Sequence, residues 1–204
     1  MGYARAGYEV MGVDCVAQPN YPFTFVKADA LTYDLGHGEF DLIHASPPCQ
    51  FYSRTQPIYG REHLDLVDRV RDRLIESGAL YVIENVEGAP LIDPIMLCGG
   101  HFKLQVYRHR LFESNYPLTA PTVHPWHIAR CTIVGQRHQP GEFMTVTGHF
   151  RDLPVARKAM GIDWMKRSEL AQAIPPAYSE YIGRQILGSA TLTDTTIGEH
   201  SHHG

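Results

Sequence analysis

Short apolar runs, each closed by a polar residue or a turn, dominate the first half of the chain. They span residues 9–14, 23–29, 40–46 and 80–86. Their β-branched and aromatic residues, bounded by Gly, Pro, Asp or Asn, predict buried strands. Between the last two runs, apolar residues recur at helical spacing over 61–77 and stop at Gly78, which predicts a helix. A strand, a helix and a strand in this order predict an α/β fold with a parallel sheet and crossover helices.

Polar groups follow these predicted strands where each one ends. They are Asp14, Asp29, the Pro-Pro-Cys-Gln turn at 47–50 and Glu84. The carboxyl ends of parallel strands form one edge of a sheet, where acidic side chains bind the ribose and base of nucleotide-type cofactors. A single Asp in such a position usually caps a turn. Together, the four positions predict a cofactor site.

The overall composition is that of an ordinary globular protein. The chain has 204 residues, of which 44% are hydrophobic, enough for one core and a small appendage. No apolar run approaches the length of a membrane span, and the first residues lack the pattern of a signal peptide. We therefore expect a soluble, cytoplasmic monomer that does not contact membranes. The four widely spaced cysteines favour reduced thiols over disulfides.

Charge is distributed unevenly along the chain. Residues 1–99 contain 7 basic and 14 acidic side chains, whereas residues 100–185 contain 11 basic and 6 acidic ones. A basic second half is compatible with a surface that faces nucleic-acid phosphates. Ordinary scatter of solvated charges explains the asymmetry equally well.

Several ordered motifs resemble those of the cytosine-5 DNA methyltransferases. The PPCQ sequence at 47–50, the ENV sequence at 84–86 and the RxR sequence at 108–110 follow that family's order, and AQAIPP at 171–176 resembles its late GNxVPP motif. Residues 2–14 resemble the helix and strand that follow the family's first motif. The resemblance covers most of residues 1–188. It implies a Rossmann-like, doubly wound methyltransferase sheet, S-adenosylmethionine as cofactor and double-stranded DNA as partner.

The resemblance also implies a mechanism for the cysteine of PPCQ. Cys49 would attack C6 of a flipped cytosine and so make C5 nucleophilic enough to accept a methyl group. Glu84 would contact N3 and the exocyclic amine of the base, and Arg110, with Arg108 nearby, would hold O2. For the cofactor, Asp14 would bind the ribose hydroxyls and Asp29 the adenine amine. Pro47 and Gln172 complete the implied cofactor contacts.

One departure from the family affects the cofactor site. The family's DxFxGxGG loop and first strand should precede residue 1, but the sequence begins at the following helix. A sheet that lacks a central strand exposes unpaired backbone, so we expect weakened stability and poor cofactor affinity. Either the true start lies upstream, or the chain is a truncated, inactive DNA-binding relic. RNA cytosine and a free pyrimidine nucleotide are the other candidate methyl acceptors.

The motifs divide the chain into four predicted regions. Residues 1–115 form the catalytic core, 116–159 a small β-rich target-recognition insertion, 160–188 a helical return to the core, and 189–204 a disordered tail. Within the insertion, we expect β runs at 131–138 and 143–151. Three arginines are its candidate DNA contacts: Arg130, Arg137 and Arg151.

Histidine and cysteine also recur near the insertion. The HxxHxxxC spacing of His124, His127 and Cys131, with Cys98 and His101 upstream, suggests zinc ligands. However, this spacing matches no established zinc pattern, so the sequence alone predicts no metal.

Overall fold

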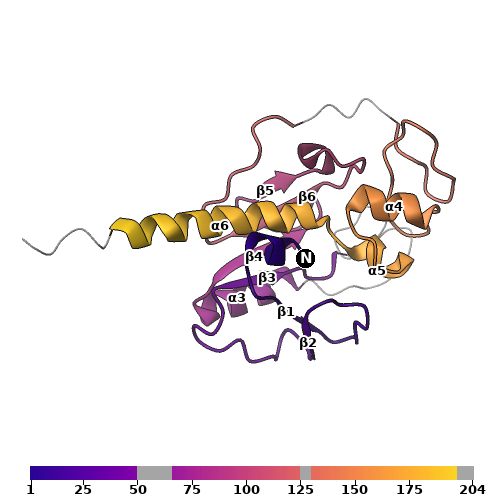
Figure 1. Ribbon diagram of the computed structural model, residues 1–204. Coiled ribbons are helices and arrows are strands. Elements are labelled where there is room, and N and C mark those ends of the chain that lie inside the picture. Colours follow the sequence, from indigo (N-terminus) through magenta and orange to yellow (C-terminus); the bar gives the residue numbers. More distant parts are fainter. Residues whose placement is uncertain (50–65, 125–129, 197–204) are drawn as a thin grey trace, which may run out of the picture.

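The computed structural model describes residues 1–49, 66–124 and 130–196, with side chains described as far as 188. Gln50, His127 and the first part of the helix expected over 61–77 lie outside these ranges. The strands are β1 (Met11–Asp14), β2 (Thr24–Lys27), β3 (Leu42–Ala45), β4 (Leu80–Asn85), β5 (Ile95–Leu97) and β6 (Arg110–Ser114). The helices are α1 (Gly2–Ala6), α3 (Val67–Ser77), the 3₁₀ helix η2 (Gly99–Phe102), α4 (Leu153–Met160), α5 (Arg167–Gln172) and α6 (Pro176–Thr196) (Figure 1).

The larger sheet has the strand order β3-β4-β6-β5. Strands β3 and β4 are parallel, as the sequence predicted, and α3 lies between them in the chain. Strand β6 runs antiparallel to both β4 and β5, so the sheet is mixed. The α/β class is therefore confirmed, and the arrangement is compatible with a methyltransferase-like fold.

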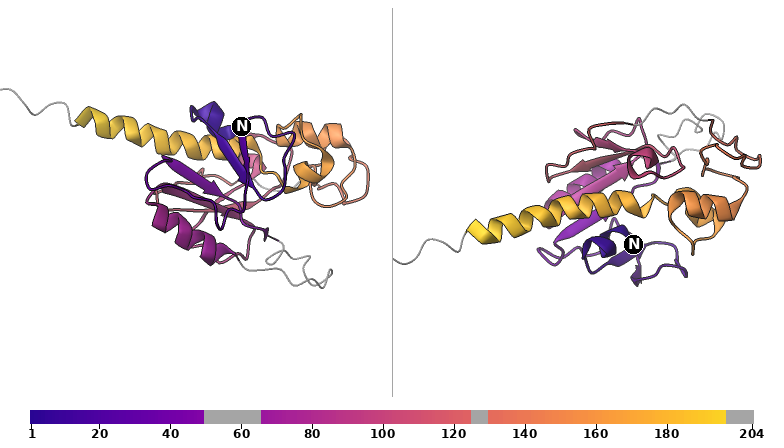
Figure 2. Two further views of the ribbon diagram at one scale, coloured as in Figure 1. Left: turned by 90° about the horizontal axis from the view of Figure 1, so that it is seen from below. Right: turned by 45° about the horizontal axis from the view of Figure 1, so that its top comes forward.

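Helices cover both faces of this sheet. Helix α6 lies along one face and α3 along the other (Figure 2). Alternation along β4 explains the division, because successive side chains of a strand point to opposite faces. Val82 packs with residues of α6, whereas Tyr81 and Ile83 pack with Leu74 of α3. Glu84 follows Val82 by two residues and therefore lies on the α6 face.

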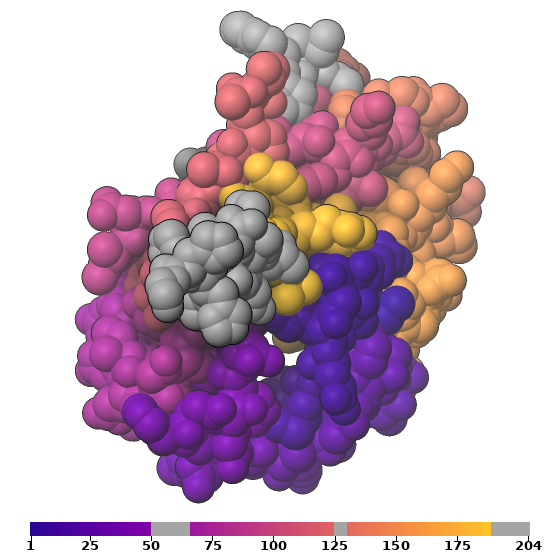
Figure 3. Space-filling model, turned by 60° about the vertical axis from the view of Figure 1, so that its left-hand side comes forward, coloured from indigo at the N-terminus to yellow at the C-terminus, as the bar shows by residue number. Residues whose placement is uncertain are grey.

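The remaining two strands form a separate parallel pair. Within the described residues, β1 pairs with β2 and neither joins the larger sheet. In the space-filling view, a narrow opening separates the indigo N-terminal surface from the purple surface beside it (Figure 3). The two strand pairs are thus separate sheets in the described part of the chain.

The prediction of β runs at 131–138 and 143–151 is wrong. In residues 130–159 the structure has no strand at these places, and β pairing is limited to two isolated bridges, Val106 with Met144 and Cys131 with Phe143. Gly135 and Gly148 interrupt the two runs with φ values of 83° and 53°, and Gly141, with a φ of 84°, lies between them. Met144, Val146 and Phe150 of the second run pack into a core shared with helices α4 and α5.

The end of the chain also differs from the sequence prediction. Helix α6 continues to Thr196, whereas we expected order to end at 188. Residues 197–204 lie outside the described ranges. In the described part of the chain, no helix combines the length and the apolar character needed to cross a membrane.

Candidate active site at the ends of β3 and β4

The parallel pairing of β3 and β4 brings two of the sequence motifs to one edge of the sheet. Ala45 lies opposite Ile83, so both strands end together. Asn85, which is 1% exposed, donates from Nδ2 to the Pro47 carbonyl oxygen at 3.1 Å. Pro47 is itself buried, and Cys49 is half-buried. The second residue of the ENV motif thus fixes the turn that presents the cysteine.

Glu84 and Arg110 form a largely buried ion pair on the α6 face of the sheet. Glu84 lies opposite Phe112, and Arg110 precedes Phe112 by two residues, so all three share a face. Arg110 Nε lies 2.9 Å from Glu84 Oε1, and the two side chains are 15% and 9% exposed. Burial raises the pKa of Glu84, although the positive charge of Arg110 and a hydrogen bond with Ser46 oppose that rise.

Arg108 is more deeply buried than Arg110 and connects distant segments. Its NH1 donates to Val146 O at 2.7 Å and its NH2 to Ala171 O at 2.8 Å. Its own carbonyl oxygen accepts a hydrogen bond from the Tyr178 hydroxyl at 2.6 Å. Burial lowers the pKa of Arg108 to about 9, with a further contribution from Arg110, so the side chain stays charged at neutral pH.

These contacts give Arg108 a positioning role. They attach the AQAIPP motif and the segment around Val146 to the start of β6. Glu84 and Cys49 lie close enough for their charges to raise the pKa of Arg108 against the effect of burial. A direct contact of Arg108 with a base stays a prediction.

A histidine that the sequence analysis did not select is connected to Glu84. His44 lies 2.8 Å from the Tyr3 hydroxyl through Nδ1 and 3.3 Å from Ser46 Oγ through Nε2. Ser46 in turn hydrogen-bonds Glu84. Burial lowers the pKa of His44 to about 4, so the imidazole is neutral at physiological pH. His44 and Ser46 are two residues apart in the predicted strand, so their side chains share one face. This spacing could have identified the histidine from the sequence.

The expected cofactor residues lie at the ends of the two parallel strands β1 and β2. Asp14 accepts hydrogen bonds from the Val16 amide at 2.7 Å and from Gln18 Nε2 at 3.2 Å. Asp29 accepts one from the Leu31 amide at 2.9 Å. Each carboxylate can accept further bonds, because its two oxygens offer about four lone-pair directions. Both therefore fit the hydroxyl and amine donors of a nucleoside.

The other two expected cofactor contacts differ in exposure. Pro47 is buried, whereas Gln172, the last residue of α5, is exposed. Pro47 follows β3 in the larger sheet, on the other side of the sheet division from Asp14 and Asp29. The described residues thus supply separate parts of a cofactor site.

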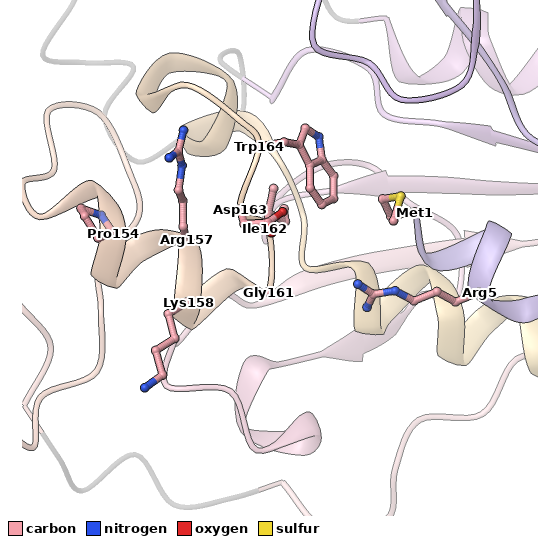
Figure 4. Close-up of a pocket in the computed structure, with 9 residues that line it drawn as sticks. All are labelled: Met1, Arg5, Pro154, Arg157, Lys158, Gly161, Ile162, Asp163 and Trp164. Atoms are coloured by element: carbon pink, nitrogen blue, oxygen red, sulfur yellow. The ribbon is translucent and has the colours of Figure 1, made fainter.

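A cleft of about 700 Å³ lies beside α1 (Figure 4). Met1 and Arg5 line one side of it, and residues of α4 and of the segment 161–164 that follows α4 line the other. Arg157, in its wall, donates from Nε and NH2 to Met165 O. None of the predicted catalytic or cofactor residues lines this cleft. We therefore place the candidate chemistry at the strand ends, where the buried ionisable groups converge.

The three arginines expected to contact DNA are all exposed: Arg130, Arg137 and Arg151. Two large apolar side chains of the same segment are also exposed, Ile133 at 64% and Val134 at 48%. This segment therefore presents both positive charge and apolar surface to solvent.

Comparison with known proteins gives one distant likeness. No family model matches the chain. The chain is 32% identical over 98 residues to "Ribosomal RNA large subunit methyltransferase K/L" of Acinetobacter baylyi. The aligned region covers 40% of this chain and 13% of that protein. This partial likeness favours a methyltransferase in general and does not distinguish the acceptor base.

Proposed function

We propose that the protein transfers a methyl group from S-adenosylmethionine to C5 of cytosine in double-stranded DNA, through a covalent bond between Cys49 and C6. One observation carries the proposal. The turn that bears Cys49 is hydrogen-bonded through Pro47 to Asn85, and the adjacent Glu84 forms a buried pair with Arg110. A nucleophile and two groups able to polarise a pyrimidine thus lie at one strand edge.

The proposed chemistry begins with addition of the Cys49 thiolate to C6. The new S–C bond moves the electron pair of the C5–C6 double bond toward C5, which alone is a poor nucleophile. Negative charge also spreads toward N3. A protonated Glu84 would donate a hydrogen bond there, and burial favours that form because it raises the pKa of this carboxyl group.

Arg110 would act on the same ring. A guanidinium has five N–H donors, and in Arg110 the Nε faces Glu84 while NH1 donates to His109 O. The group can therefore hold Glu84 and also donate to O2 of the base. Arg108 would hold the surrounding segments in place.

When bound, S-adenosylmethionine supplies an electrophilic methyl group, which C5 takes as the sulfonium becomes a thioether. Loss of the C5 proton to a base then lets the Cys49 sulfur leave and restores the aromatic ring. Asp14 and Asp29 would hold the nucleoside of the cofactor, with Pro47 and Gln172 as further contacts.

DNA is the favoured acceptor because the exposed Arg130, Arg137 and Arg151 lie in the basic half of the chain. RNA cytosine is the second candidate, favoured by the partial likeness to a protein named for ribosomal RNA. The divided sheet supports the other alternative, a DNA-binding relic that cannot hold the cofactor.

A hydrogen-exchange assay tests the base site independently of the cofactor. Duplex DNA and RNA that carry tritium at C5 of cytosine are incubated with the protein and no methyl donor. Reversible addition of Cys49 to C6 exchanges the C5 hydrogen with water, so tritium release from DNA is expected. Cys49→Ser should abolish the release and Glu84→Gln should reduce it strongly. Release only from RNA would reassign the substrate, and release that persists in Cys49→Ser would refute the nucleophile.

A further inference from the structure

Three potential metal ligands converge beside the candidate active site. They are Cys98, His109 and His124, and one ligand atom from each lies within 4.8 Å of the others. Cys98 lies directly between β5 and η2, His109 immediately precedes β6, and His124 belongs to the segment that follows β6. Residues far apart in the sequence therefore meet at one point.

The separations of these atoms suit a tetrahedral zinc site. His109 Nε2 and His124 Nε2 lie 3.2 Å apart. Zn–N bonds of about 2.05 Å at tetrahedral angles put two nitrogen ligands about 3.3 Å apart, and a sulfur and a nitrogen ligand about 3.6 Å apart. The histidine pair already has this spacing, and the sulfur needs to move by about 1 Å at most.

Packing holds Cys98 in this position. The side chain is fully buried, and Gly99 packs so closely that an added Cβ would lie 2.1 Å from Val106 O. The backbone amide of Cys98 donates to His101 Nδ1 at 3.2 Å. Backbone N–H groups of Gly100 and Arg108 also hydrogen-bond the sulfur. Burial raises the pKa of this thiol and these N–H groups oppose the rise, so a bound metal would have to displace the thiol proton.

Other side chains surround the two histidines. Glu87 Oε1 lies 3.9 Å from His109 Nδ1, on the opposite side of the ring from the nitrogen that faces His124, which is longer than a hydrogen bond. A hydrogen-bonded carboxylate on the second ring nitrogen is the usual support of a metal-bound histidine, and a movement of Glu87 by about 1 Å would supply one. The His101 ring meets the His124 ring edge-on, with centroids 5.2 Å apart and an interplanar angle of 89°.

A hydrogen bond between two neutral imidazoles would also explain the 3.2 Å distance. It would not explain why a buried cysteine, with amide donors to its sulfur, lies at the same point. One thiolate and two imidazoles form a ligand set that favours zinc over magnesium or calcium.

We propose that Cys98, His109 and His124 bind a zinc ion, with water as the fourth ligand. The ion would connect the segment ending at His124 to the start of β6. Because His109 lies between Arg108 and Arg110, it would also help to fix the arginines of the base site. The proposal is independent of the methyl acceptor.

The HxxHxxxC spacing in the sequence groups His124 with residues that do not belong to this cluster. Cys131 is exposed and does not belong to the cluster, and His127 lies outside the described residues. His101 Nδ1 is occupied by the Cys98 amide. His109 is the middle residue of the RxR motif, so the sequence did not mark it as a metal ligand.

Metal binding to the 204-residue chain tests this directly. The tail histidines are first replaced by His200→Asn, His202→Asn and His203→Asn, so that they do not contribute. After treatment with a chelator, the protein is titrated with Zn²⁺ against a chromophoric competitor, and with Co²⁺ to record its absorption spectrum. We expect one equivalent to bind, with a tetrahedral Co²⁺ spectrum and a thiolate-to-cobalt charge-transfer band.

Two variants and two controls make the outcome decisive. Cys98→Ser should remove the charge-transfer band, and His124→Asn, at an exposed position, should weaken binding by at least roughly tenfold. Cys131→Ser and His149→Asn, both exposed and outside the cluster, should leave the affinity unchanged. No binding by the tail-substituted protein, or equal losses in His124→Asn and His149→Asn, would overturn the proposal.

Discussion

Replacement of Asn85 by alanine tests how the fold positions Cys49. In the structure, Asn85 Nδ2 donates to Pro47 O at 3.1 Å, and Asn85 Oδ1 accepts the Val86 amide at 2.9 Å. Alanine removes both partners without adding bulk. The Pro47 carbonyl then lies buried without its donor, and the turn that carries Cys49 loses its connection to β4.

The expected loss of stability follows from these contacts. A buried polar group that loses its partner costs about 1–3 kcal/mol, and here one carbonyl and one amide are affected. Because Val86 is only partly buried, we expect a loss of about 2–4 kcal/mol in the free energy of unfolding. For a chain of this length, that lowers Tm by roughly 5–15 °C. The catalytic effect should be larger, since a displacement of about 1 Å can reduce a rate about 100-fold.

A matched control exists at the opposite end of β4. Asn115 accepts the Tyr81 amide at 2.7 Å and donates to Ala79 O at 3.1 Å, but it is exposed. Because the Tyr81 and Ala79 partners are buried, Asn115→Ala should cost a comparable amount, roughly 2–4 kcal/mol, but it should leave the chemistry unchanged. Urea unfolding and tritium release from C5 of cytosine, at a temperature where all variants are folded, measure the two effects. A destabilised Asn85→Ala protein with the parent exchange rate would refute the positioning role of this hydrogen bond.

Two further predictions concern stability. The pKa of His44 is about 4 in the folded protein, below its unfolded value near 6.5, so the full stability is present above about pH 6.5 and is lost toward pH 4. His44→Gln should flatten this dependence, which contributes about 3 kcal/mol at most to the free energy of unfolding measured with urea. Identical pH profiles for the parent protein and the variant would contradict this prediction. Glu113→Gln removes the charged partner of Arg71, which lies 2.7 Å away on the α3 face of the sheet. We expect a loss of about 3–5 kcal/mol in the free energy of unfolding and no change in the rate of tritium release by the folded protein. A loss below about 1 kcal/mol would refute the importance of that ion pair.

Local patterns predicted much of the fold. The strands β1 to β4 and helix α3 carry their own apolar periodicity, and their order required a parallel pairing of β3 with β4. That pairing also explains why Cys49 and Glu84 could be assigned to one edge from the sequence. The glycine-rich segment after residue 130 misled the same reasoning. Met144, Val146 and Phe150 pack against α4 and α5, whereas Ile133 and Val134 are exposed, and neither run pairs as a strand.

Other parts of the site depend on contacts between distant residues. The two carbonyl oxygens bound by Arg108 belong to Val146 and Ala171, and no local pattern marks them as partners. The contact of His44 with Tyr3 similarly depends on how α1 packs beside the sheet. A short motif identifies the chemical type of a residue, whereas its function depends on the surfaces that fold against it.

The central claim is a covalent bond between Cys49 and cytosine during methyl transfer, and a trapping experiment tests it most directly. The protein and Cys49→Ser are incubated with S-adenosylmethionine and duplex DNA that contains 5-fluorocytosine, then separated on a denaturing gel. Fluorine at C5 cannot leave as a proton, so the protein should remain attached to methylated DNA. We predict a shifted band whose mass includes one methyl group, and none from Cys49→Ser. The same adduct from Cys49→Ser, or none from the parent protein, would contradict the proposed mechanism.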